Sequence, residues 1–192
     1  LGIDYAGLPN GYEVLTVSPA ENAIYDAAGN IGSTTQSNNQ QTFTEERVRE
    51  ISWIEHNTSY SKYNSFVKVD SNTYALAYTG SGNDGYIQTF TIPTSGTSIT
   101  KVTTVEHDNY INYYSSILQV DADTYVMAYY GYYSGYGAQI RTFTIPVDGS
   151  AVTTVYTLKH LSGNYQGYWN SLIALDADTY VLAFMDSGSD GW

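Results

Sequence analysis

Short stretches of apolar and aromatic residues recur along the chain, separated by turn-forming residues. From residue 55 they fall into units of four, which in the first unit occupy residues 64–69, 73–78, 85–92 and 98–105. The second stretch of each unit (TYALAY, TYVMAY, TYVLAF) is almost continuously apolar, which predicts a strand buried on both faces. The third and fourth stretches alternate, which predicts a partly exposed surface. No segment has helical periodicity, so the pattern predicts an all-β fold.

An internal repeat underlies this pattern. Its repeated columns are His56, His107 and His160, which are 51 and 53 residues apart; Asp70, Asp121 and Asp176; and Tyr74, Tyr125 and Tyr180. The string TFTIP occurs at 89–93 and again at 142–146. A single twisted four-stranded sheet cannot bury both of its faces, so we expect the units to stack on one another.

Four short antiparallel strands per unit of this length resemble the blades of the β-propeller superfamily, over residues 40–192. The resemblance implies an array of four-stranded antiparallel blades around an axis. The chain lacks the Trp-Asp, kelch and integrin signatures of the best-known blades. The string SGSDGW at 187–192 resembles the Asp-box of sialidase propellers, although its spacing departs from Ser-x-Asp-x-Gly-x-Thr-Trp.

The repeat divides the chain into partial and complete units. Residues 55–105 and 106–158 are complete, residues 159–192 supply a first and a second strand, and residues 40–54 supply a third and a fourth, because QTFT at 41–44 repeats residues 88–91. This amounts to about three blades, a partial ring, whereas closed propellers have about four to eight. Either the chain is part of a longer array, or two copies form a six-bladed ring. Exposed blade edges favour a homodimer or a larger assembly.

Residues 1–39 do not follow the repeat. The residues LPNGYEVLTVSP, with IYDAAGN further on, resemble the end of Ig-like or cadherin-like modules of bacterial surface proteins. In the alternative interpretation this segment is a degenerate first blade, with strands at 12–17 and 23–28. The Ig-like interpretation implies a modular bacterial protein that is secreted or attached to the cell surface.

The charge and composition exclude several classes of partner. Seven Lys and Arg stand against nineteen Asp and Glu, a formal net charge of -12, which argues against nucleic acids and anionic membranes. The absence of Cys excludes a disulfide scaffold and a thiol nucleophile. No apolar run approaches the roughly 18 residues needed to span a bilayer, so we expect no membrane insertion.

Tyr is unusually frequent, with 21 residues in 192. Antiparallel strands alternate in direction, so the loops between units and the loops between second and third strands emerge on one face. The candidate binding residues in these loops are Tyr60, Tyr63, Tyr110, Tyr113, Tyr114, Tyr133, Tyr136, Tyr165, Tyr168 and Trp169. Rigid rings with a polar tip suit sugars and protein epitopes, which predicts a non-enzymatic module that binds glycan or protein. In the alternative interpretation the rings only wedge between blades, and the repeat is architectural and self-associating.

Catalytic and metal chemistry have weaker signals. One His per unit favours a structural role, because a catalytic base needs a single tuned site. Asp84, Asp186 and Asp190 lie in Gly-rich loops that could hold Ca²⁺, although the spacing is not that of an EF-hand. We expect no other cofactor and assign no catalytic residue. A sialidase-like glycoside hydrolase with a carboxylate pair is the enzymatic alternative.

Overall fold

The computed structural model of the chain describes residues 14–16, 27–30, 40–42, 50–132, 135–163, 166–188 and 190–191. The chain divides into two compact units, residues 1–50 and 51–192. In residues 1–50, β1 (Val14–Thr16) pairs antiparallel with β2 (Gln40–Thr42), and a turn occupies residues 27–28. These elements do not distinguish the Ig-like tail from the degenerate blade, and both stay predictions.

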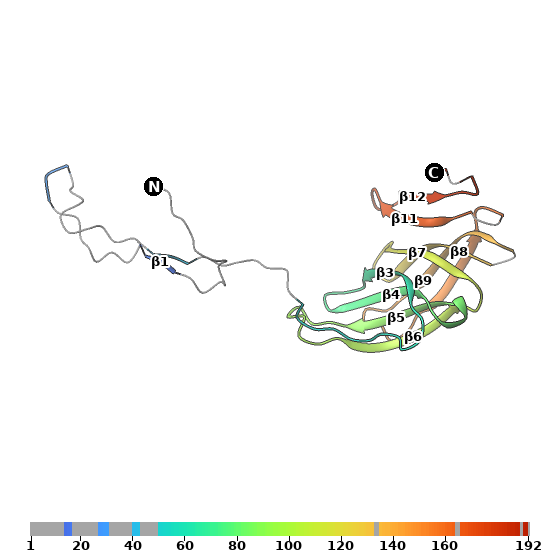
Figure 1. The fold of residues 1–192 in the computed structure, drawn as a ribbon, viewed down its shortest axis with the longest axis horizontal. Helices are drawn as coiled ribbons and strands as arrows, with labels where there is room; N and C mark the ends of the chain where they lie inside the picture. The colour runs from blue at the N-terminus through green and yellow to red at the C-terminus, as the bar shows by residue number, and fades with distance from the viewer. Residues whose placement is uncertain are drawn as a thin grey trace. The chain divides into compact units, whose positions relative to one another are not determined.

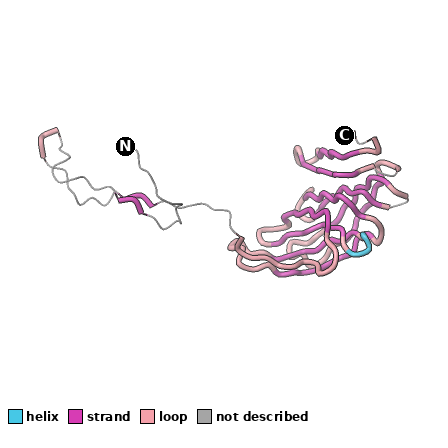
Figure 2. Tube along the Cα trace, viewed as in Figure 1, coloured by secondary structure: helices cyan, strands magenta, loops and turns pink. Residues whose placement is uncertain are grey.

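Residues 51–192 consist of consecutive antiparallel strands (Figure 1). The first sheet contains β3 (Lys62–Lys68), β4 (Thr73–Thr79), β5 (Gly85–Thr91) and β6 (Thr100–Asp108). The second sheet contains β7 (Asn112–Gln119), β8 (Thr124–Gly131), β9 (Gly137–Thr144) and β10 (Thr153–Lys159). A hairpin follows, formed by β11 (Tyr168–Ala174) and β12 (Tyr180–Met185). Apart from a single 3₁₀ turn at Ser81–Asn83, the described ranges contain no helix (Figure 2).

This architecture confirms the all-β prediction and the repeated four-stranded antiparallel sheets. The predicted strands of the first unit match β3 to β6 within about three residues at each end, and β6 extends to Asp108. The described part of the segment predicted as a fourth strand, residues 50–54, is not a strand. Even so, Ile54 packs against the first sheet, as Val105 of β6 packs against the core between the two sheets. Residues 43–49 lie outside the described residues.

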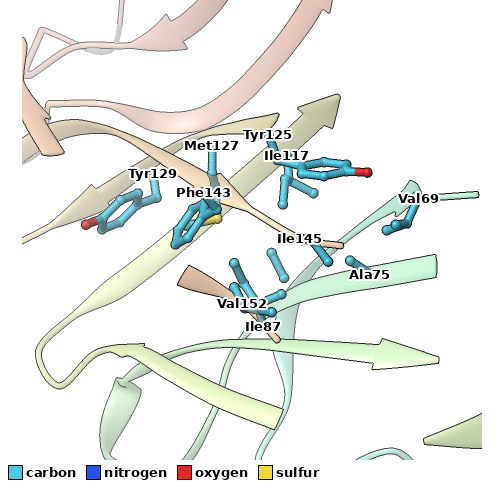
Figure 3. Packing of buried hydrophobic residues seen from close by; sticks show 11 residues of the cluster. Val69, Ala75, Ile87, Ile117, Tyr125, Met127, Tyr129, Phe143, Ile145 and Val152 are labelled. Atoms are coloured by element: carbon cyan, nitrogen blue, oxygen red, sulfur yellow. The ribbon is translucent and has the colours of Figure 1, made fainter. Parts of the chain in front are cut away.

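The main core lies between the first and second sheets (Figure 3). The residues that form it are Val69, Ala75, Ala77, Ile87, Ile117, Tyr125, Met127, Tyr129, Phe143, Ile145 and Val152. Strands β4 and β8 are almost fully buried, as their apolar sequences predict. Strands β5 and β9 are also mostly buried, so the predicted partial exposure is wrong for them: successive residues are buried, which means that both faces of each strand are covered.

The hairpin differs from the prediction for TYVLAF. Strand β12 is exposed at every second residue, because only one face of the hairpin packs against the second sheet. The first strands β3, β7 and β11 lie side by side and are joined by a repeated hydrogen bond. The Ile117 N–H donates to Ser65 Oγ, and the Leu172 N–H donates to Ser116 Oγ, each over 3.0 Å. The sequence repeat is therefore also a repeat of tertiary contacts.

Candidate functional site

Three aromatic residues at equivalent positions of the repeat form one row, which we call the aromatic row. These are Tyr63 of β3, Tyr114 of β7 and Trp169 of β11. The ring centroids of Tyr63 and Tyr114 are 4.3 Å apart, and those of Tyr114 and Trp169 are also 4.3 Å apart. The side chain of Trp169 is 61% exposed, so the row ends in a large ring open to solvent.

The backbone at all three positions is left-handed. The φ angles are 55° at Tyr63, 59° at Tyr114 and 55° at Trp169, a region that bulky residues rarely adopt. Each position lies where the pairing register of its strand shifts, that is, at a β-bulge. A bulge changes the direction of a side chain and increases the local twist, which explains how a strand residue points along the row. Such strain persists where the surroundings enforce it, and it is common at binding sites.

Further rings extend the aromatic row into a continuous cluster. Tyr168 lies 4.8 Å from Tyr114 and 4.6 Å from Tyr130, measured between ring centroids. The remaining contacts run from Tyr113 to Tyr63 (5.5 Å), Tyr130 to Tyr136 (6.1 Å), Tyr136 to Tyr132 (4.7 Å) and Tyr132 to Tyr110 (5.4 Å). Loops between units and loops between second and third strands thus meet on one side, as strand direction predicts.

An open depression lies at the far end of this cluster. It has a volume of about 330 Å³ and is lined by Tyr110, Ile111, Tyr132 and Tyr136. The three Tyr side chains are all exposed. The depression therefore offers ring faces and phenolic hydroxyls to a ligand from solvent.

The electrostatics of the cluster are close to neutral. Burial raises the pKa of Tyr113 and of Tyr114, so both hydroxyls stay protonated at physiological pH. The nearby Lys62 ammonium lies 4.9 Å from the ring centroid of Tyr60. The cluster is therefore suited to stacking and hydrogen bonding more than to ion pairing.

The three repeated His residues lie at the junctions between units. His56 meets the ring of Tyr78 edge-on at 4.9 Å, His107 meets Tyr129 at 5.8 Å, and His160 meets Phe184 at 5.4 Å. Burial lowers the pKa of each; for His107, burial and the Arg141 charge lower it to about 3. All three imidazoles are thus neutral packing groups, in agreement with a structural role.

A buried polar network surrounds His107. Arg141 Nη2 lies 3.3 Å from Asp108 Oδ2, and both side chains are almost fully buried. The Tyr129 hydroxyl donates to the same carboxylate oxygen over 2.8 Å, and Arg141 also donates to the His107 carbonyl and, over 2.9 Å, to Thr157 Oγ1. Burial raises the pKa of Asp108, which the Tyr129 hydrogen bond and the Arg141 charge partly offset. The network joins β6 to the second sheet.

The residues at this junction change together along the repeat. In the first unit, Asn57 stands in place of Asp108 and Gln88 in place of Arg141. The Asn57 amide donates to the Tyr78 hydroxyl over 3.5 Å, and the Gln88 amide donates to Thr104 Oγ1 over 2.7 Å. In the third unit, Leu161 takes the acidic position and Phe184 takes the Tyr position. The junction residues are thus neutral and polar in the first unit, charged in the second and apolar in the third. Such joint changes are expected of residues that contact one another and stabilise the fold.

The candidate Ca²⁺ ligands are not gathered into one group. Asp84 follows the 3₁₀ turn in the first unit, and its pKa is raised by burial and by Glu106 and Asp108. Asp186 Oδ1 accepts the Gly188 N–H over 2.8 Å, in a loop that the Asp186 N–H closes onto the Asp190 carbonyl. Among the described residues, no three His, Asp or Glu side chains form a group that could hold a metal ion. Calcium binding stays a prediction, which a melting temperature that rises with added Ca²⁺ would support.

The structure brings together most of the predicted binding residues. Seven lie in the cluster described above: Tyr63, Tyr110, Tyr113, Tyr114, Tyr136, Tyr168 and Trp169. Tyr60 lies beside Lys62, whereas Tyr133 and Tyr165 lie outside the described residues. Sequence analysis missed Tyr130, which links the two halves of the cluster, because it directly follows the predicted core strand TYVMAY and was assigned neither to that strand nor to the binding loops. Its signal was a ring at a position where the first unit has Thr79.

No protein-family model matches the chain, and no curated protein is significantly similar to it in sequence. Within the ranges that the structure describes, no helix is long and apolar enough to cross a membrane.

Proposed function

We propose that the chain is a non-enzymatic binding module that recognises a glycan or a protein through its aromatic face, the surface formed by the aromatic row, the further rings of the cluster and the depression beside them. The observation that carries this proposal is the aromatic row, with a left-handed bulge at the same position of all three units. Packing alone does not require rings there, since each bulky residue pays a conformational penalty of roughly 1–3 kcal/mol. The exposed end of the row at Trp169 supplies an accessible stacking surface.

The features of the face favour a neutral saccharide among these ligands. Its depression of about 330 Å³ is at the small end of the range for ligand pockets, which suits the end of a sugar chain more than a flat protein epitope. The hydroxyls of Tyr110, Tyr132 and Tyr136 can bond sugar hydroxyls, while the rings stack on sugar C–H faces. The net charge of -12 disfavours acidic ligands.

We propose that the module belongs to a bacterial extracellular or cell-surface protein, with the repeated sheets as blades of a propeller and residues 1–39 as an Ig-like tail. Support comes from the resemblance of LPNGYEVLTVSP and IYDAAGN to surface-protein modules, and from the acidic, Cys-free composition. Adhesion is the role that these features favour.

A second candidate function is architectural self-association. The outer face of the hairpin favours it, since Ile173 is 53% exposed and Val181 is 41% exposed on that face. Adjacent exposed apolar residues are typical of interaction sites. This function and ligand binding use different surfaces and are compatible.

A glycan array compares four proteins: the wild type, Trp169→Ala, Tyr132→Ala and the control Trp53→Ala. Trp53 is 76% exposed and takes no part in the aromatic cluster, so its loss removes an equal ring without touching the face. We expect Trp169→Ala and Tyr132→Ala each to lose about tenfold in affinity, which corresponds to about 1.4 kcal/mol. This loss is comparable with the roughly 1–3 kcal/mol that one base stacked on an aromatic side chain contributes. Unchanged binding by both variants, or no glycan bound by the wild type, would refute the saccharide; capture of a protein by the same face would replace it.

A further inference from the structure

The series of sheets in residues 51–192 has a different apolar face at each of its two ends. At one end, the outer face of the hairpin exposes Ile173, Leu175 and Val181. At the other end, the first sheet exposes Phe66 beside a cavity of about 120 Å³, whose lining also includes the buried side chains of Leu76 and Phe90. Phe66 is 52% exposed. We call these the hairpin face and the Phe66 face.

The repeat identifies the hairpin face as one that packs on a following sheet. Ile173, Leu175, Val181 and Ala183 take the positions of Val67, Val69, Ala75 and Ala77 in the first sheet. Three of those residues, Val69, Ala75 and Ala77, are core residues against the second sheet, with Val67 packed beside them (Figure 3). The same face is thus buried in the first unit and exposed in the third.

The Phe66 face has the complementary identity. Phe66, Leu76 and Phe90 take the positions of Ile117, Met127 and Phe143 in the second sheet. Those three residues receive the first sheet and are almost fully buried. The Phe66 face therefore has the surface that accepts a preceding sheet.

Residues beside the Phe66 face already occupy the place of a preceding unit. Ile54 packs against Leu76 and Phe90 as Val105 packs against the core of the next junction. His56 meets Tyr78 as His107 meets Tyr129. What this junction lacks, within the described residues, is a sheet bearing the equivalents of Ala75 and Ala77.

We infer that the hairpin face of one copy of this chain packs on the Phe66 face of a second copy. The two faces have the residues of the two sides of the packed junction between the first and second sheets, so the contact between copies repeats a junction that the chain already forms. Two copies joined at both junctions would share a twofold axis and leave neither face unpaired. This inference deepens the self-association candidate and does not depend on the ligand of the aromatic face.

The cavity behind the hairpin supports the same partner. It has a volume of about 360 Å³ and is lined by apolar residues of the second sheet and by Leu172, Tyr180 and Leu182 of the hairpin. At the equivalent place between the first and second sheets, Phe143 of β9 and Ile145, which follows that strand, complete the core.

Light scattering with size-exclusion chromatography measures the mass of the wild type, Val181→Asp, Phe66→Asp and the control Val155→Asp. Val155 is an exposed valine of β10 whose equivalent, Val102, stays exposed although its sheet packs against a neighbour. We expect twice the chain mass of 21.2 kDa for the wild type and for Val155→Asp, and a halved mass for the other two variants. Circular dichroism verifies that each variant is folded.

A cysteine pair tests the register, because the chain has no Cys of its own. In the first junction, Ser65 Oγ accepts the Ile117 N–H, so Ser65→Cys with Ile117→Cys is the intramolecular reference. The equivalent pair across two copies is Ser171→Cys with Phe66→Cys, and we expect it to form a covalent dimer on oxidation. A monomeric wild type, or a dimer that resists both face variants and forms no cross-link, would overturn the inference. Glycan binding by monomeric Val181→Asp separates this outcome from failure of the ligand proposal.

Discussion

Arg141 and Asp108 form the charged junction between the first and second sheets, and their replacement by the residues of the first unit is the most informative perturbation. The variant Arg141→Gln leaves the Asp108 carboxylate buried with the Tyr129 hydroxyl and the Tyr110 N–H as partners. Removing one partner of a buried ion pair costs about 3–5 kcal/mol. We therefore expect Arg141→Gln and Asp108→Asn each to destabilise folding by about 3 kcal/mol.

The double variant has a different expected result. Asp108→Asn with Arg141→Gln reproduces the pair Asn57 and Gln88 that the chain itself uses at the preceding junction. Exchange of a buried ion pair for neutral groups is often close to neutral, so we expect the double variant to lie within about 1 kcal/mol of the wild type. The sum of the two single effects, about 6 kcal/mol, would then exceed the double effect by about 5 kcal/mol, which is above the roughly 0.5–3 kcal/mol usual for residues in contact.

Urea unfolding followed by circular dichroism gives these free energies by linear extrapolation. Lys68→Gln is the control, because it removes an exposed cation from β3 and should change stability by less than about 0.5 kcal/mol. Additive single effects would refute the coupled junction, since they would mean that the two residues contribute independently. A changed slope in one variant would mean that it alters the compactness of the unfolded or folded state.

Three further predictions concern burial, strain and the core. Burial lowers the pKa of His107 from 6.5 to about 3, so His107 binds a proton in the unfolded chain at a higher pH than in the folded chain. The free energy of unfolding should therefore fall by about 1.4 kcal/mol per pH unit below pH 6.5. The raised pKa of Asp108 has the opposite effect on stability at acidic pH. His107→Gln should flatten the melting temperature between pH 7 and 5, and an unchanged slope would contradict this. At Trp169, where φ is 55°, Gly should be more stable than Ala by about 1 kcal/mol in urea unfolding, the reverse of the order in an ordinary strand; Ala above Gly would rule out the strain. Phe143→Ala should cost about 3–5 kcal/mol in the same assay, because the ring is fully buried between the two sheets, and a cost under 1 kcal/mol would mean that they do not pack there.

Much of the fold could be predicted because its signals are local and repeated. The apolar runs TYALAY and TYVMAY became the buried strands β4 and β8, and the alignment of His56 with His107 identified equivalent junctions. Alternation in β5 and β9 was misleading, because both faces of these strands are covered, which depends on what packs against the sheet and not on the strand's own pattern. The exposure of Val181 could not be read from an apolar strand, since burial depends on which sheet lies opposite.

The location of the candidate site could be predicted from the sequence, but the backbone geometry and the contacts that form it could not. Strand direction puts the candidate aromatic residues on one side, and six Tyr and Trp169 meet there. The left-handed bulge at Tyr63, Tyr114 and Trp169 has no sequence signal, because aromatic residues disfavour that conformation. The pairing of Asp108 with Arg141 joins residues 33 positions apart and emerges only from the stacking of two sheets.

Fluorescence of Trp169 tests most directly whether the aromatic face binds a ligand. In the variant Trp53→Phe with Trp192→Phe, Trp169 is the only tryptophan in the chain. Titration with an oligosaccharide selected on the array should shift its emission to shorter wavelength and saturate, because a sugar stacked on the exposed indole excludes water. The matched variant that keeps Trp53 alone should show no shift. A shift that follows Trp53, or binding that leaves the emission of Trp169 unchanged, would contradict the proposal that the aromatic row binds the ligand.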